Sequence, residues 1–136
     1  MNIFTSGRYF TLFDYKVSHS QLLIRSQKSE IHMNNIDIIV FGVKFLQIPK
    51  SFWGLSIEEI SGDYGKIVHS KISVNRDIVL GMNLYAISTQ KLEYYVFGAF
   101  CKIYVNKLDF SETSLGVLEI KGREIELNDD NRDLIE

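Results

Sequence analysis

The sequence has little of what marks a secreted, metal-bound or helical protein. Cys101 is the one cysteine, so no disulfide can close within the chain. Two alanines in 136 residues count against long helices. His19, His32 and His69 lie far apart in the chain, without a cysteine or carboxylate at the spacing of zinc ligands. We therefore expect no metal site and no cofactor.

Motifs that carry a reaction are also missing. Gly62 and Gly65 do not precede a lysine–serine pair at P-loop spacing, and there is no Gly-x-Ser-x-Gly motif. Glu58 and Glu59 would face opposite ways on a strand, so they make a poor acid–base pair. Cys101 lies in an apolar run, where a thiol packs as a small hydrophobe. We expect no catalytic residues, and an enzyme built from dispersed residues is the alternative.

The charge and the hydropathy of the chain argue against nucleic acid and membranes as partners. The net charge of −2 and the even spread of lysine and arginine argue against nucleic acid as a partner. No run approaches the roughly 18 apolar residues of a membrane span, and the N-terminal stretch lacks the apolar core of a signal peptide. The length favours a single domain over residues 1–136. Abundant Ile, Asn and Lys are common where coding DNA is A/T-rich, so we expect a bacterial, cytoplasmic protein.

The longest apolar run covers residues 92–105, LEYYVFGAFCKIYV. Its aromatic and β-branched residues are stiff in a helix and suit a strand. Gly98 in its interior predicts a bulge or bend. If side chains alternate throughout, one face is wholly apolar and should be buried. That face carries Tyr95, Phe97, Ala99, Cys101, Ile103 and Val105.

A second long run covers residues 36–48 and ends before Pro49. Its segment 40–42 repeats the Val-Phe-Gly of residues 96–98. A duplicated half is one interpretation, and two long strands that need the same bend is the one we favour. We expect the two runs to lie side by side or face to face at the centre of the fold.

Shorter alternating segments, separated by turn residues, fill the rest of the chain. Such a pattern predicts an all-β fold, an antiparallel β-sandwich or β-barrel of about eight to ten strands with little helix. Residues 51–54 and 62–65 read as turns, and residues 129–136 as a loose acidic tail. The shorter strands are expected at residues 9–17, 21–26, 55–60, 66–74, 78–88, 115–121 and 124–127.

Aromatic residues in predicted turns are the one feature that suggests a site. Phe52, Trp53 and Tyr64 are placed there, and exposed aromatics are typical anchors for a protein partner. The alternative is that they plug the end of a barrel or sandwich. The first interpretation gives a non-catalytic protein-binding module, for example an immunity or antitoxin-type protein.

A second hypothesis makes the protein a binder of a small apolar ligand. A closed barrel of about eight strands can hold one such molecule. Tyr94, Phe100 and Tyr104, on the more aromatic face of the longest run, would line its cavity. Association of identical chains through an uncovered strand edge is compatible with either hypothesis.

Overall fold

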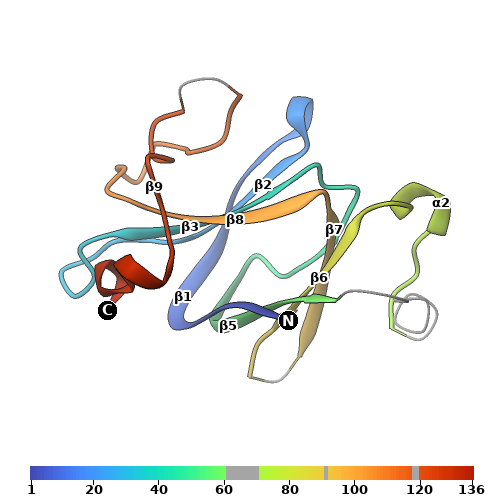
Figure 1. The fold of residues 1–136 in the computed structure, drawn as a ribbon, viewed down its shortest axis with the longest axis horizontal. Coiled ribbons are helices and arrows are strands. Elements are labelled where there is room, and N and C mark those ends of the chain that lie inside the picture. Colours follow the sequence, from blue (N-terminus) through green and yellow to red (C-terminus); the bar gives the residue numbers. More distant parts are fainter. Residues whose placement is uncertain (61–70, 91, 118–119) are drawn as a thin grey trace.

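A computed structural model describes residues 1–60, 71–90, 92–117 and 120–136. Nine strands dominate it, with short helical turns between them (Figure 1). The predicted turn at residues 62–65 lies outside the described residues, as does part of the predicted strand at 66–74. In chain order the elements are β1 (Asn2–Lys16), η1 (Val17–His19), β2 (Gln21–Ser26), β3 (Asn35–Phe41), β4 (Phe45–Gln47), β5 (Ser51–Ile60), α2 (Arg76–Val79), β6 (Asn83–Ser88), β7 (Glu93–Gly98), β8 (Phe100–Asn106), β9 (Ile125–Glu126) and η2 (Asp129–Ile135).

The strands form one antiparallel sheet in the order β4-β7-β6-β5-β1-β2-β3-β8-β9. In the chain, β4 follows β3 and β8 follows β7, so the ladder between β3 and β8 continues as the ladder between β4 and β7. The two ends of the order therefore meet, and the sheet closes on itself as a barrel. This confirms the predicted all-β class, and the pairing favours the barrel among the two architectures.

Both long runs bend at the same corner of this barrel. A Cβ on Gly98 would lie 2.5 Å from Val40 Cγ1, and a Cβ on Gly42 would lie 2.9 Å from the Cβ of Ala99. Gly42 also has a φ of 67°, which side chains disfavour. The two glycine-bent runs thus lie side by side, as predicted. Each glycine is there because the partner strand passes too close for a side chain.

The bend also changes which side chains face inward. In β7, Val96 belongs to the interior cluster while Phe97 faces outward. In β8, after Gly98, Ile103 points inward and Tyr104 outward. The alternation therefore shifts by one residue at the corner, as it does at a β-bulge. The prediction of a single buried face along residues 92–105 is wrong for this reason.

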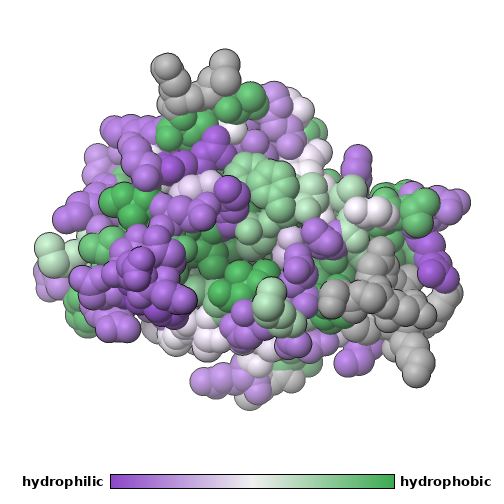
Figure 2. All heavy atoms as spheres, viewed as in Figure 1, coloured by the Kyte–Doolittle hydropathy of each residue, from purple (hydrophilic) through white to green (hydrophobic). Residues whose placement is uncertain are grey.

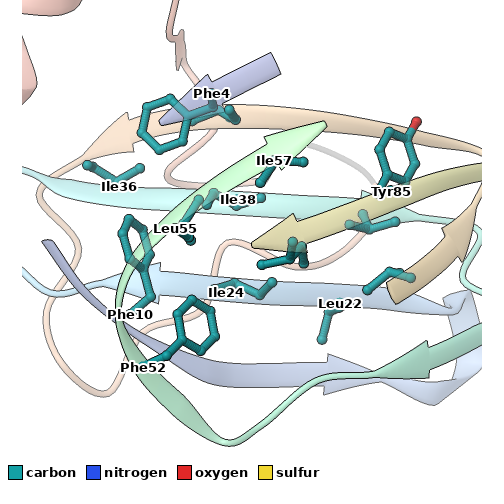
Figure 3. Close-up of a cluster of buried hydrophobic side chains, with 14 of the residues drawn as sticks. Phe4, Phe10, Leu22, Ile24, Ile36, Ile38, Phe52, Leu55, Ile57 and Tyr85 are labelled. Atoms are coloured by element: carbon teal, nitrogen blue, oxygen red, sulfur yellow. The ribbon is translucent and has the colours of Figure 1, made fainter. Parts of the chain in front are cut away.

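Apolar side chains from opposite walls fill the barrel interior (Figure 3). Phe10 of β1 and Phe52 of β5 lie beside each other in it, with ring centroids 6.2 Å apart. The interior thus joins strands that are distant in sequence, and its burial is the main source of stability. Its buried members are Phe4, Phe10, Leu22, Ile24, Ile36, Ile38, Val40, Val43, Phe52, Leu55, Ile57, Tyr85, Ile87, Val96 and Ile103.

Two smaller apolar clusters lie outside the barrel wall. Each forms where a connecting segment packs on a strand face that would otherwise meet water, which explains why several strands are apolar on both faces. The cluster on β6 and β7 also takes residues from the segment 71–82, and contains Ile72, Val79, Leu84, Ala86, Tyr95 and Phe97. The cluster on β2, β3 and β8 contains Leu23, Ile39, Tyr104 and Leu115.

Residues 51–54 form the start of β5 and not the predicted turn. Trp53 pairs with Tyr9 of β1, and Phe52 pairs with Phe10. These partners, together with Thr11 opposite Ser51, lie within the strand expected at residues 9–17. The prediction was wrong because Pro49 and Gly54, which flank the segment, favour a turn locally, whereas pairing with β1 makes it a strand.

The segment expected as a strand over residues 78–88 is strand only from Asn83. Asn75 caps the short helix α2, because its side chain accepts a hydrogen bond from the Asp77 amide. Near the C-terminus, the described part of residues 115–127 contains one strand, β9. It pairs with β8, and the predicted hairpin over residues 115–127 is therefore wrong.

The sequence suggested a loose tail over residues 129–136. In the structure, Asp129–Ile135 form η2 after the cap residue Asn128, and Ile135 packs against the barrel interior. The Asn34 side chain also donates a hydrogen bond to the carbonyl of Leu134 at 3.0 Å. Within the described ranges, no helix is long and apolar enough to cross a membrane.

Candidate functional site

A bulge in β1 places the residue around which the candidate site is built. The register between β1 and β5 shifts between Ser6 and Tyr9. Gly54, opposite this point, has a φ of 73°, and a Cβ on it would lie 3.8 Å from Gly7 Cα. Bulges often re-aim a side chain next to a binding site. Gly7 and Arg8 are the two residues of β1 at this shift, and Arg8 is 8% exposed.

Arg8 joins β1 to the chain beyond β2. Strand pairing between β1 and β2 starts only at Thr11, so Arg8 lies in the part of β1 that is not paired with β2. The Arg8 Nε donates to Ser26 Oγ at 2.9 Å, and Nη2 donates to the carbonyl of Asn34 at 2.9 Å. Two longer bonds from Nη2, each 3.3 Å, reach the carbonyls of Ser26 and Gln27. These acceptors are all neutral.

The Arg8 guanidinium lacks both an acceptor for one nitrogen and a counter-charge among the described residues. Its Nη1 is buried and has no hydrogen-bond partner among the described residues. No carboxylate of the described residues lies within ion-pair distance of Arg8. Burial lowers the pKa of Arg8 below its usual value, because desolvation disfavours the charged form. A buried polar group without a partner is rare in a native structure and calls for an explanation.

Arg8 lines an open cleft of about 660 Å³ at the surface. Exposed apolar side chains surround it: Trp53 is 69% exposed and Ile31 is 83% exposed. The ring centroid of Tyr9 lies 4.8 Å from that of Trp53, so the two form an aromatic wall. Arg8 is the one residue with a permanent charge among those that line the cleft, which are Ser6, Gly7, Arg8, Tyr9, Ser26, Gln27, Ser29, Ile31, His32, Trp53 and Ile135.

Trp53 also borders a second, shallower cleft on its other side. This cleft has a volume of about 270 Å³ and includes Leu92 and Tyr94. Leu92 is 61% exposed. Trp53 therefore stands between two hollows of one surface. Hydrophilic side chains gather instead over η2 and the C-terminus, on the face shown in Figure 2.

Of the three predicted partner-binding residues, the structure describes Phe52 and Trp53, which point to opposite faces of β5. Trp53 is exposed, as expected of an anchor. Phe52 is 8% exposed and belongs to the barrel interior, because neighbouring residues of a strand point to opposite faces. Tyr64 lies outside the described residues. Trp53 lines both clefts, whereas Phe52 lines the smaller one alone.

The three residues predicted to line a ligand cavity are also separated. Tyr94 packs against the barrel interior. Tyr104 belongs to the outer cluster on β8, and Phe100 is 47% exposed with its ring stacked on Phe41 at 4.6 Å. These residues do not meet around one cavity, because the shift at Gly98 turns the later pair outward.

A second buried arginine lies on the outer face of β2. Arg25 Nε donates to Asp37 Oδ1 at 2.6 Å, and Nη2 donates to Asp37 Oδ2 at 2.8 Å. Both side chains are fully buried. The Arg25 Nη1 donates to the carbonyl of Glu112 at 2.7 Å, and the Phe13 ring lies 4.1 Å from the guanidinium carbon. This is a bidentate ion pair that the chain itself completes.

The Asp37 carboxylate has further donors from the segment that covers it. Ser114 Oγ donates to Asp37 Oδ2 at 2.6 Å, and Asn106 Nδ2 donates to the same oxygen at 2.9 Å. Asn106 Nδ2 also donates to the carbonyl of Gly122 at 3.0 Å. The network thus ties Glu112, Ser114 and Gly122 of the covering segment to the barrel. Ser114 is fully buried, so its hydroxyl is closed to a ligand.

The histidines and the cysteine were the other groups considered for chemistry. His19 lies in η1, His32 lies between β2 and β3, and His69 lies outside the described residues. Burial, and then the charge of Glu59, raise the pKa of the Cys101 thiol to about 12, so it is a poor nucleophile. In the part of the chain that the structure describes, no three His, Cys, Asp or Glu residues gather as a metal site would require.

Arg8 was missed from the sequence because the first strand was expected to begin one residue later. The signal was present, since Arg8 falls in phase with Phe4 and Phe10, both of which face inward. A charged residue at an inward position of a strand is uncommon.

Comparisons with protein-family models, with curated proteins and with solved structures found no match to this chain.

Proposed function

We propose that the protein is a non-catalytic protein-binding module, and that its contact surface is centred on Trp53. The observation that carries this proposal is a tryptophan 69% exposed at the wall of a 660 Å³ cleft. Tryptophan is enriched among the residues that dominate the energy of protein interfaces.

The surroundings of Trp53 support this proposal. Tyr9 and Ile31 on one side, and Leu92 on the other, are exposed by 41%, 83% and 61%. Clusters of large apolar side chains at the surface often mark interaction sites. The immunity or antitoxin type remains the concrete form of such a module that the sequence suggested.

Site-specific photo-crosslinking tests the proposal. A photoreactive phenylalanine analogue is placed at position 53, and the protein is irradiated in its native cells. We expect one dominant crosslinked protein, identified by mass spectrometry, and the unlabelled wild-type protein in excess should suppress it.

Position 17 provides the matched control. Val17 is 80% exposed on a turn and lines none of the clefts described above. The same analogue at position 17 should not give the crosslink. If positions 53 and 17 yield the same set of products, the proposed surface is wrong. If position 53 crosslinks to a second copy of the chain, the module acts by self-association and has no separate partner there.

A further inference from the structure

We propose that Arg8 is the anchor of the cleft for a carboxylate, supplied by an acidic side chain of the protein partner that covers Trp53. This inference rests on the proposed function and adds to it the chemistry of the partner. It starts from the buried Nη1 of Arg8, which no described residue satisfies.

The charge balance of the cleft points to an anion. Arg8 carries a positive charge and is 8% exposed, yet its acceptors are one hydroxyl and three carbonyls. No aspartate or glutamate is among the residues that line the cleft. A buried charge is usually compensated by an opposite charge. A carboxylate from outside would supply both the missing charge and the missing acceptor.

The shape of the cleft points to a side chain carried by a larger molecule. Tyr9 and Trp53 form an aromatic wall, and Ile31 is exposed at the same cleft. A free inorganic anion would leave these surfaces in water. An acidic residue next to an apolar residue would cover them while its carboxylate reaches Arg8. Because Nη1 is buried in the unbound chain, binding requires a small change in the side chains of the cleft, as is common at interfaces.

The test uses 3-phenylpropionate as the probe, since it joins a carboxylate to an apolar ring. Trp53 is the one tryptophan of the chain, so intrinsic fluorescence reports on the cleft. The matched neutral control is 3-phenylpropionamide. We expect a saturable change in fluorescence with the carboxylate, and binding at least tenfold weaker with the amide. Equal binding of the two compounds, or no binding of the carboxylate, would overturn the role of Arg8.

The variant Arg8→Gln is used in the second part of the fluorescence test. Provided that its circular dichroism matches the wild type, it should bind the carboxylate and the amide equally weakly. If the variant does not fold, the comparison of the two probes on the wild-type protein still decides the question. A crosslink from position 53 without any carboxylate preference would leave the proposed function in place and reject this inference alone.

Discussion

The barrel has two buried arginines, Arg25 and Arg8, and they differ in how far the described residues satisfy their hydrogen bonds and balance their charge. Arg25 holds both oxygens of Asp37 and a carbonyl, and its nitrogens all have acceptors. Arg8 has neutral acceptors, and its Nη1 has no partner in the part of the chain that the structure describes. Arg25 lies under a covering segment, whereas Arg8 borders an open cleft.

The difference separates a structural charge from a candidate binding charge. Both arginines fasten a connecting segment to the barrel, so burial and hydrogen bonds alone do not distinguish them. What distinguishes them is the carboxylate, which the chain provides for Arg25 and does not provide for Arg8 among the described residues. An arginine that is already paired with a carboxylate of its own chain has no free donor for an anionic ligand. Arg8 still has a free donor and an unbalanced charge among the described residues.

The largest effect is expected from Asp37→Asn. It preserves the size of the side chain and leaves Arg25 buried without a counter-charge, which should lower the free energy of unfolding by about 3–5 kcal/mol. Chemical denaturation measures this change. The matched control is Asp109→Asn, since the Asp109 side chain is 81% exposed in its ion pair with Lys28. The control should change stability by less than about 0.5 kcal/mol. Similar losses in the two variants would show that Arg25 does not depend on its ion pair.

Gly98→Ala, at the corner of the barrel, should cause the second largest loss in the free energy of unfolding. In Gly98→Ala the new Cβ would lie 2.5 Å from Val40 Cγ1 and 3.1 Å from the carbonyl oxygen of Phe41. Neither neighbour can move away easily, so stability should fall by about 1–3 kcal/mol. Gly7→Ala is the control, because a Cβ there meets no atom within 4 Å. A neutral Gly98→Ala variant would contradict the close approach of the two bent strands.

Arg8→Gln should cost less than Asp37→Asn in the same denaturation assay. It removes hydrogen bonds to Ser26 and Asn34, but it also removes a buried charge without a counter-charge. We expect a loss of about 1–2 kcal/mol. A loss as large as that of Asp37→Asn would mean that Arg8 is as fully compensated as Arg25, and the contrast between the two would fail.

Trp53→Ala should have the smallest effect on stability. The side chain is 69% exposed, so the free energy of unfolding should change by less than about 0.5 kcal/mol. Affinity for the crosslinked partner should fall by at least tenfold, as measured by titration calorimetry. Unchanged affinity together with unchanged stability would remove Trp53 from the interface.

Local patterns in the sequence were enough to predict several of the strands and the two bends. Alternation and apolar runs marked β2 and the two long segments, and Gly42 and Gly98 marked their bends. The inward or outward direction of side chains beyond each bend was not predictable. A one-residue shift reverses the facing of a strand, and the sequence does not show where the ladder shifts.

The candidate site was predictable only in part. Trp53 was expected to be exposed, and it is. Arg25 and Asp37 stand alone as charges in apolar strands and pair directly across β2 and β3, so a hairpin around residues 27–34 would have brought them together. The separation of Arg8 from the described carboxylates could not be predicted from the sequence, because it depends on which segments the closed barrel brings near.

Nuclear magnetic resonance of protein labelled with ¹⁵N-arginine tests the contrast between the two arginines most directly. Spectra of the guanidinium groups are recorded with increasing 3-phenylpropionate. The account predicts that the signals of Arg8 shift until saturation while those of Arg25 stay in place. Unshifted Arg8 signals, or equal shifts of both arginines, would contradict it.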